Sequence, residues 1–156
     1  MAIELDGVLG DTRQLWADWL EDAARRFRSI APLYPQALPQ DRGEAAAELD
    51  RWAGAGVGDW RAALARFAED RAPVYLRPDA EVSAALRALS ASDTRLGVFT
   101  DAPEELARVA VAQLGATRRL EALEAGTGAL ERLLALLGSE TEVVRDVSGL
   151  RLQSGT

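Results

Sequence analysis

Apolar and acidic side chains alternate at the start of the chain, from Ile3 to Asp6. This alternation predicts a short strand, which Gly7 ends. Successive side chains of a strand point to opposite faces, so the carboxylates of Glu4 and Asp6 are expected together near the strand's end. Such a pair can bind a cation, or it can be solvated or paired with Arg145.

A helical pattern dominates residues 14–75. Asp11 and Gln14 have the spacing of a capping box, and apolar residues then recur at three- and four-residue steps as far as Phe27. Prolines interrupt the pattern over residues 30–39, where we expect a connector because proline is disfavoured inside a helix. The first strand is therefore followed by a long amphipathic helix and then by a break.

Two more helices are expected after this connector, each opened by an aspartate. Asp41 followed by Glu44 predicts a helix as far as Trp52, and Asp59 precedes a second run of apolar residues at helical spacing. The glycine-rich stretch 53–58 between them lacks the preceding strand and the following lysine of a phosphate-binding loop. We interpret this stretch as a joint between two helices.

Large aromatic side chains are concentrated in these helical stretches. All four tryptophans of the chain lie there, at positions 16, 19, 52 and 60. We expect them to form the core of a helix bundle, because aromatic rings contribute large buried areas. The alternatives are a surface that stacks on a substrate, or a helical interaction module whose aromatic faces are partly exposed.

From residue 76 onward the pattern changes to alternating strands and helices. Strands are expected at 94–100, 120–124 and 141–145, and helices at 78–89, 103–114 and 128–137. Strands that alternate with helices predict a parallel sheet with right-handed crossovers. The expected fold class is therefore α/β, and the last residues, 153–156, are expected to be loose.

Composition limits the chemistry that the chain can perform. It has 156 residues without Cys or His, and its 18 basic residues are all Arg. Thiol catalysis, Ser-His-Asp catalysis and zinc held by Cys or His are therefore excluded. The net charge of −7 argues against a nucleic-acid partner. No segment is long enough to span a membrane and no basic, apolar leader is present, so we expect no membrane partner and a cytoplasmic location.

The run Asp6-Gly7-Val8-Leu9 resembles the first motif of the haloacid dehalogenase (HAD) superfamily, Asp-x-Asp-Gly-(Val/Thr)-Leu. The resemblance implies a HAD-like core with a Rossmann-like parallel sheet, formed by residues 1–13 and 76–156, with strand order 4-1-2-3. It implies a small α-helical cap, residues 14–75, inserted after the first strand. It also implies hydrolysis of phosphate esters with Mg²⁺ as the cofactor.

The resemblance assigns catalytic and phosphate-binding roles to the first two motifs. Asp6 matches the general acid/base, whereas Glu4 stands where the family has its nucleophilic aspartate. The glutamate carboxylate is one methylene farther from the backbone, and a displacement of about 1 Å can lower a rate on the order of 10²-fold. Thr100 matches the hydroxyl residue that binds phosphate, and Asp101, which follows it at the same strand end, is assigned to phosphate binding with it.

The third and fourth motifs of the family are matched less fully. The basic residue of the third motif has no counterpart at its expected position, and Arg118, Arg119 and Arg132 are candidates to replace it. In the fourth motif Asp146 is kept, while Arg145 stands where the family has a glycine. The metal ligands that the resemblance implies are Glu4, Asp6 and Asp146.

Two functions of different classes follow from these motifs. The first is Mg²⁺-dependent hydrolysis of a phosphate ester, with low or altered activity, on a small phosphorylated molecule. The second is a catalytically inactive HAD-like protein that acts as a ligand-binding or protein-interaction module, with a protein partner that the sequence does not identify. Mg²⁺ between Glu4 and Asp146 would favour the first function, and Arg145 in the metal position would favour the second.

Overall fold

Within residues 1–29 and 33–155, which the computed structural model describes, four strands form one parallel sheet. Its strands in spatial order are β3, Ala122–Ala125; β2, Gly97–Thr100; β1, Ala2–Glu4; and β4, Val143–Val144. On the central strand, Ile3 lies opposite Val98 on one side and Val144 on the other. The α/β fold class and the strand order 4-1-2-3 expected from the sequence are confirmed.

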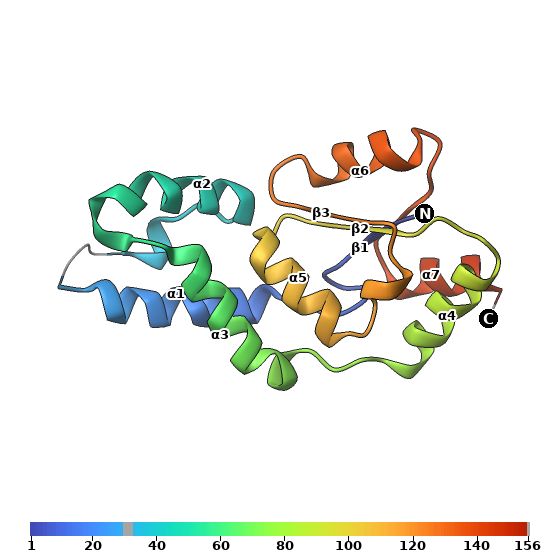
Figure 1. The fold of residues 1–156 in the computed structure, drawn as a ribbon, viewed down its shortest axis with the longest axis horizontal. Helices are drawn as coiled ribbons and strands as arrows, with labels where there is room; N and C mark the ends of the chain where they lie inside the picture. Colours follow the sequence, from blue (N-terminus) through green and yellow to red (C-terminus); the bar gives the residue numbers. More distant parts are fainter. Residues whose placement is uncertain (30–32, 156) are drawn as a thin grey trace.

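Helices cover both faces of this sheet (Figure 1). One face carries α6, Ala129–Leu137, and the other carries α4, Ala80–Ala91, α5, Glu104–Gln113, and α7, Val147–Ser154. Ala2 packs with the α6 layer and Ile3 with the opposite layer, and neither side chain is exposed. The covered part of a strand is apolar when both of its faces are packed, and the polar residues Glu4 and Thr100 stand at the carboxyl ends of β1 and β2.

The helical segment, residues 14–75, builds a second apolar cluster beside the sheet (Figure 1). Its helices are α1, Arg13–Phe27, α2, Arg42–Trp52, and α3, Trp60–Tyr75. The rings of Trp16, Trp19 and Trp60 lie with their centroids 5.4 to 6.5 Å apart. These side chains are 6%, 2% and 1% exposed, which confirms an aromatic core for three of the four tryptophans, whereas Trp52 is partly buried and packs against this cluster.

The helical segment packs directly on α5. Ala102 and Leu106 are buried in the same apolar cluster as the three tryptophans. Beside this cluster, Arg61 of α3 donates a hydrogen bond to Glu105 of α5 at 3.2 Å. The division of the chain into a core and a cap stays a prediction, because these contacts join the two parts through shared apolar side chains.

Aspartate caps open two helices of this segment as expected. Asp41 and Asp59 each accept a hydrogen bond from the backbone N–H three residues later, at 2.9 and 3.1 Å. The capping box predicted to begin at Asp11 is wrong, because α1 begins after Thr12 and has no side-chain cap. Asp11 instead accepts hydrogen bonds from the backbone and the guanidinium of Arg13, a charged donor that competes with the more distant N–H groups.

The last helix corrects the expectation that residues 153–156 are loose. Asp146 caps α7 by accepting a hydrogen bond from the N–H of Gly149 at 2.7 Å, and Leu150 is fully buried. Burial of one apolar side chain against the sheet, together with the aspartate cap, orders a segment whose sequence is mostly polar. The helix therefore continues to Ser154.

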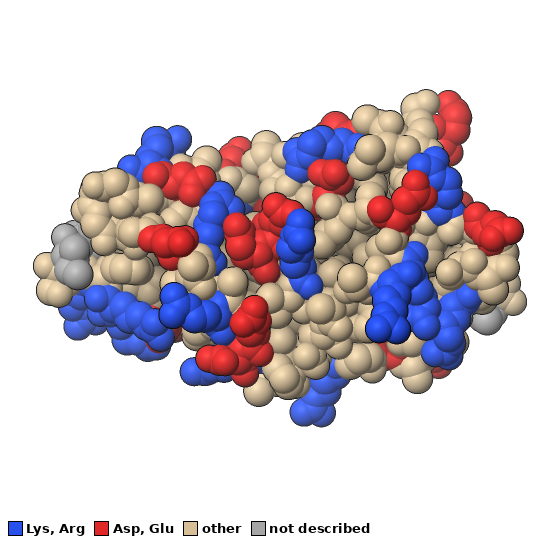
Figure 2. Space-filling view, viewed as in Figure 1, with Lys and Arg blue, Asp and Glu red and all other residues tan. Residues whose placement is uncertain are grey.

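Charged side chains of both signs are mixed over the face of the molecule shown in Figure 2. Among the described residues, no helix combines the length and the apolar character needed to cross a membrane. The expected lack of nucleic-acid and membrane partners and the cytoplasmic location stay predictions. Residues 30–32 of the expected connector and residue 156 of the expected loose end lie outside the described residues.

Candidate functional site

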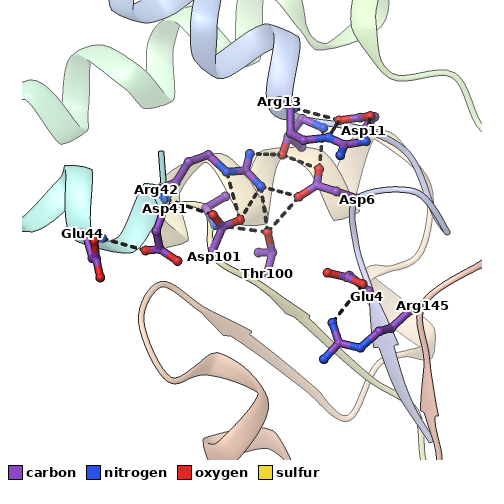
Figure 3. Close-up of polar contacts among 12 residues, drawn as sticks. Glu4, Asp6, Asp11, Arg13, Asp41, Arg42, Glu44, Thr100, Asp101 and Arg145 are labelled. Carbon is purple, nitrogen blue, oxygen red and sulfur yellow. Dashed lines mark hydrogen bonds and ion pairs between the residues drawn. The ribbon is translucent and has the colours of Figure 1, made fainter. Parts of the chain in front are cut away.

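The carboxyl ends of β1 and β2 bring Asp6 and Thr100 into contact (Figure 3). The hydroxyl of Thr100 donates a hydrogen bond to Asp6 Oδ2 at 3.1 Å. Thr12, which precedes α1, donates from its N–H and its hydroxyl to Asp6 Oδ1 at 2.6 and 2.7 Å. Ligands of parallel α/β sheets bind at this end of the strands. Two residues that the resemblance assigns to catalysis and phosphate binding therefore lie together.

The guanidinium of Arg42 lies among these side chains (Figure 3). Arg42 is the first residue of α2, and it is only 4% exposed. Its Nη1 donates to Thr12 Oγ1 at 2.6 Å, and its Nη2 donates to Thr100 Oγ1 at 3.3 Å and to the carboxylate of Asp6. A charge withdrawn from water needs charged and hydrogen-bonding partners, and the strand ends supply them.

Asp101 supplies the second carboxylate around Arg42. Its Oδ1 accepts hydrogen bonds from Nε and Nη2 at 3.1 and 2.7 Å, and its Oδ2 accepts one from the Arg42 backbone N–H at 3.0 Å. Burial acts to raise the pKa of the Asp101 carboxyl, but the hydrogen bonds and charge of Arg42 outweigh it and hold that pKa below its ordinary value. Asp101 is therefore a carboxylate at neutral pH.

The same balance keeps Arg42 charged. Burial acts to lower the pKa of its guanidinium, and the negative charges of Asp6 and Asp101 together with their hydrogen bonds raise it overall. Removing this cation would leave two carboxylates facing each other with little solvent around Asp6, whose side chain is 9% exposed. The site is therefore an ion cluster in which the guanidinium of Arg42 compensates the charge of both carboxylates.

The residue after Arg42 brings α2 close to the loop that follows β3. A Cβ atom on Gly43 would lie 2.4 Å from Thr127 Oγ1 and 2.6 Å from the Thr127 backbone N. Real side chains do not approach backbone atoms so closely, so glycine is required for this contact. Two consecutive residues thus hold the N-terminus of α2 against the carboxyl end of the sheet.

Glu4 lies apart from the Arg42 cluster, beside Arg145 (Figure 3). Arg145 Nη1 donates to Glu4 Oε2 at 3.3 Å, and its guanidinium carbon lies 5.2 Å from the ring centroid of Phe99. The two charged side chains are 56% and 31% exposed, so the pair contributes little to stability. The residue that the resemblance puts at the nucleophile position is nevertheless paired with the basic side chain that stands where the resemblance expects a glycine.

The acidic residues implied as Mg²⁺ ligands do not come together. Asp146 caps α7, Glu4 contacts Arg145, and Asp6 is bonded to Arg42. Within the part of the chain that the structure describes, no group of three acidic side chains is arranged to hold a metal ion. Mg²⁺ takes oxygen ligands in near-octahedral geometry, of which one or two are commonly carboxylates and the rest water or phosphate. As placed here, the three side chains do not form the ligand set that the resemblance implies.

The positive charge at the site comes from a residue that the sequence analysis did not select. Arg132 is bonded to a glutamate of β3 and to loop carbonyls, Arg119 donates to the carbonyl of Gly115, and Arg118 is exposed. One local signal could have identified Arg42: a basic residue in the first turn of a helix opposes the helix dipole. Such a residue needs a compensating partner elsewhere in the fold.

Comparison with known proteins supports the fold of this chain. The chain matches no protein-family model and no curated protein. Its structure is similar to that of a proposed beta-phosphoglucomutase from Thermotoga maritima, with a TM-score of 0.55 and 15% sequence identity over 99% of this chain and 80% of that one. At this identity the similarity extends to the arrangement of strands and helices.

Proposed function

We propose that this chain is a catalytically inactive HAD-like protein that acts as a ligand-binding or protein-interaction module. The observation that carries the proposal is the guanidinium of Arg42, bonded to Asp6, Thr100 and Asp101. These are the groups that the resemblance assigns to acid/base catalysis and to phosphate binding. The side chains that would receive a phosphate ester are therefore already engaged by the protein itself.

The energetics of Arg42 support this proposal. Breaking a buried ion pair by removing one partner costs about 3–5 kcal/mol. A phosphate ester entering the site would separate Arg42 from two carboxylates and bring a third anion beside them. The electrostatic free energy of phosphate binding would therefore be less favourable here than in an acidic and hydroxyl-lined site that is not occupied by an arginine.

The geometry of Glu4 supports it as well. A nucleophile must approach the reacting phosphorus within about 3–3.5 Å, whereas the Glu4 carboxylate contacts Arg145. A missing positive donor or a misplaced nucleophile in such a site each lowers a rate by about two orders of magnitude or more. The replacement at Glu4 and the missing basic residue of the third motif would both lower the rate of hydrolysis.

The second candidate function is hydrolysis of a phosphate ester with low activity. It is supported by one observation, the contact of Asp6 with Thr100 at 3.1 Å at the ends of adjacent strands. Hydrolysis would require both Arg42 and Arg145 to leave the positions described above. We therefore rank it below the binding function.

Steady-state hydrolysis of a panel of phosphate esters in the presence of Mg²⁺ tests the proposal. The native protein, Glu4→Ala and Asp6→Asn are assayed side by side for released phosphate. The proposal expects all three to give the same background rate. Turnover by the native protein that both substitutions abolish would overturn it and establish the hydrolase.

A further inference from the structure

The side chain of Arg42 is bound by the rest of the protein in the manner of a ligand. Its three guanidinium nitrogens make five hydrogen bonds, and all the acceptors lie outside α2. The acceptors belong to four side chains, Asp6, Thr12, Thr100 and Asp101. No nitrogen of the guanidinium group is left without an acceptor.

We propose that these four side chains form a guanidinium-binding pocket, and that Arg42 is its tethered ligand. In the native chain the side chain of Arg42 holds the helical segment against the ends of β1 and β2. When Arg42 is absent, the pocket binds an alkylguanidinium from solution. The inference rests on the proposed function, since it identifies the group that occupies the site of the inactive protein and the ligand class that this site takes once Arg42 is removed.

The chemistry of the pocket favours a guanidinium over an ammonium group. The acceptors surround the guanidinium at three different nitrogens, with Thr12 bonded to Nη1, Thr100 to Nη2 and Asp101 to Nε. A planar guanidinium presents five N–H groups in a fixed fork, whereas an ammonium group is a single compact donor. An ammonium ion cannot reach all of these acceptors at once.

The charge of the pocket excludes anions. Its two carboxylates face one guanidinium. Without Arg42 the pocket keeps two carboxyl groups and two hydroxyl groups, and it has no cation left to pair with an anion. A phosphate or carboxylate ligand would be repelled, and a cation with several N–H donors would be attracted.

The side chain of Arg42 also fixes the position of the helical segment relative to the sheet. Arg42 is the first residue of α2, and its neighbour Gly43 contacts the backbone of Thr127 in the loop after β3. The guanidinium therefore fixes the end of α2 from which this close contact is made. Without the guanidinium, the N-terminus of α2 keeps the hydrogen bond from the Arg42 backbone N–H to Asp101 and the Gly43 contact, but it loses the five side-chain hydrogen bonds of Arg42.

Chemical rescue of Arg42→Ala tests the proposal. This substitution keeps Cβ and removes two methylenes and the guanidinium, which ethylguanidinium replaces atom for atom. The thermal midpoint of unfolding is measured with and without millimolar ethylguanidinium, and with ethylammonium as the ion of equal charge. We expect Arg42→Ala to melt several degrees below the native protein, and ethylguanidinium alone to recover part of that loss, because a ligand that binds only the folded state raises its stability.

Arg61→Ala is the matched control. Arg61 is also an arginine of the helical segment that pairs with a carboxylate of the core, Glu105, but its side chain is 35% exposed. Neither ion should change the midpoint of Arg61→Ala or of the native protein. Three results would overturn the pocket. The two ions could raise the midpoint of Arg42→Ala equally, ethylguanidinium could raise the midpoints of both variants equally, or ethylguanidinium could leave the midpoint of Arg42→Ala unchanged.

Poor folding of Arg42→Ala would not leave the question open. In that case the yield of folded protein after dilution from urea replaces the thermal midpoint, and a yield that ethylguanidinium does not raise counts against the pocket. Ester hydrolysis by the native protein separates the two proposals. If ethylguanidinium rescues Arg42→Ala and the native protein hydrolyses esters, the guanidinium pocket stands and the proposal of an inactive protein is wrong. If there is neither rescue nor hydrolysis, the pocket is wrong and the proposal of an inactive protein stands.

Discussion

At the scale of single residues, a small number of side chains decides what this site can do. Arg42, Asp6 and Asp101 form an ion cluster at the ends of two parallel strands, and Thr12 and Thr100 complete its hydrogen bonds. A buried ion pair contributes little net stability compared with apolar packing, yet it is costly to break. Under the proposed function, the cluster therefore acts chiefly on which ligand the site accepts.

The charge of Asp101 makes part of the folding stability depend on pH. Its pKa in the folded protein is below its unfolded value of about 3.9, so the stabilisation is complete above that pH and is lost as the pH falls through the folded pKa. We expect Asp101→Asn to be less stable than the native protein at pH 7, and the difference to shrink below about pH 4. Urea unfolding of both proteins from pH 7 to pH 3 measures this, and a difference that does not change with pH would refute it.

At the scale of elements, the N-terminus of α2 is the part of the helical segment that meets the site. Asp41 caps the helix, Arg42 enters the ion cluster, and Gly43 packs against Thr127. The cap could be predicted from sequence because a capping aspartate and its N–H group are three residues apart. The two tertiary contacts could not, because their partners lie in segments far away along the chain.

Gly43→Ala should therefore lower stability, even though alanine is the better helix former. Its Cβ would meet both the backbone N and the side chain of Thr127 at less than 3 Å, so α2 or the loop must shift. Such overpacking costs about 1–3 kcal/mol. Gly54→Ala is the control, because a Cβ there meets no atom within 4 Å. Urea unfolding should show a lower free energy of unfolding for Gly43→Ala alone, and equal values for both variants would contradict the close contact.

At the scale of the whole molecule, the apolar clusters of the sheet and of the helical segment meet at one interface. The sheet and its helices form a cluster on each face, and the helical segment forms a further cluster that includes Leu106 of α5 and Ala102 just before it. Apolar periodicity predicted these clusters, since alternating strands and helices, and the spacing of the tryptophans, are local patterns. How the clusters pack together follows from shape rather than from any short motif.

The shared interface predicts one cooperative unfolding transition. All four tryptophans lie in the helical segment, so their fluorescence reports on that part, whereas far-ultraviolet circular dichroism reports on the whole chain. We expect the two signals to give the same urea midpoint, because coincident transitions mark a two-state unit. An earlier transition in fluorescence would show that the helical segment unfolds independently.

The sequence alone predicted the acidic and hydroxyl side chains of the candidate site, but not the arginine that is bound to them. The resemblance assigned Asp6 and Thr100 to one site, and the structure brings them into contact at the ends of adjacent parallel strands. Pairing of Glu4 with Arg145 was among the alternatives that the sequence left open, and the structure contains this pair. Arg42 was missed because its acceptors are 30 to 59 positions away, and only the fold brings them near.

The most direct measurement is a crystal structure of the native protein grown with Mg²⁺ and inorganic phosphate at high concentration. The proposed binding function predicts that the Arg42 guanidinium stays bonded to Asp6 and Asp101, with no phosphate on Thr100. Phosphate bound to Thr100 with Mg²⁺ at Asp6, and Arg42 withdrawn from both, would contradict the account and restore the hydrolase.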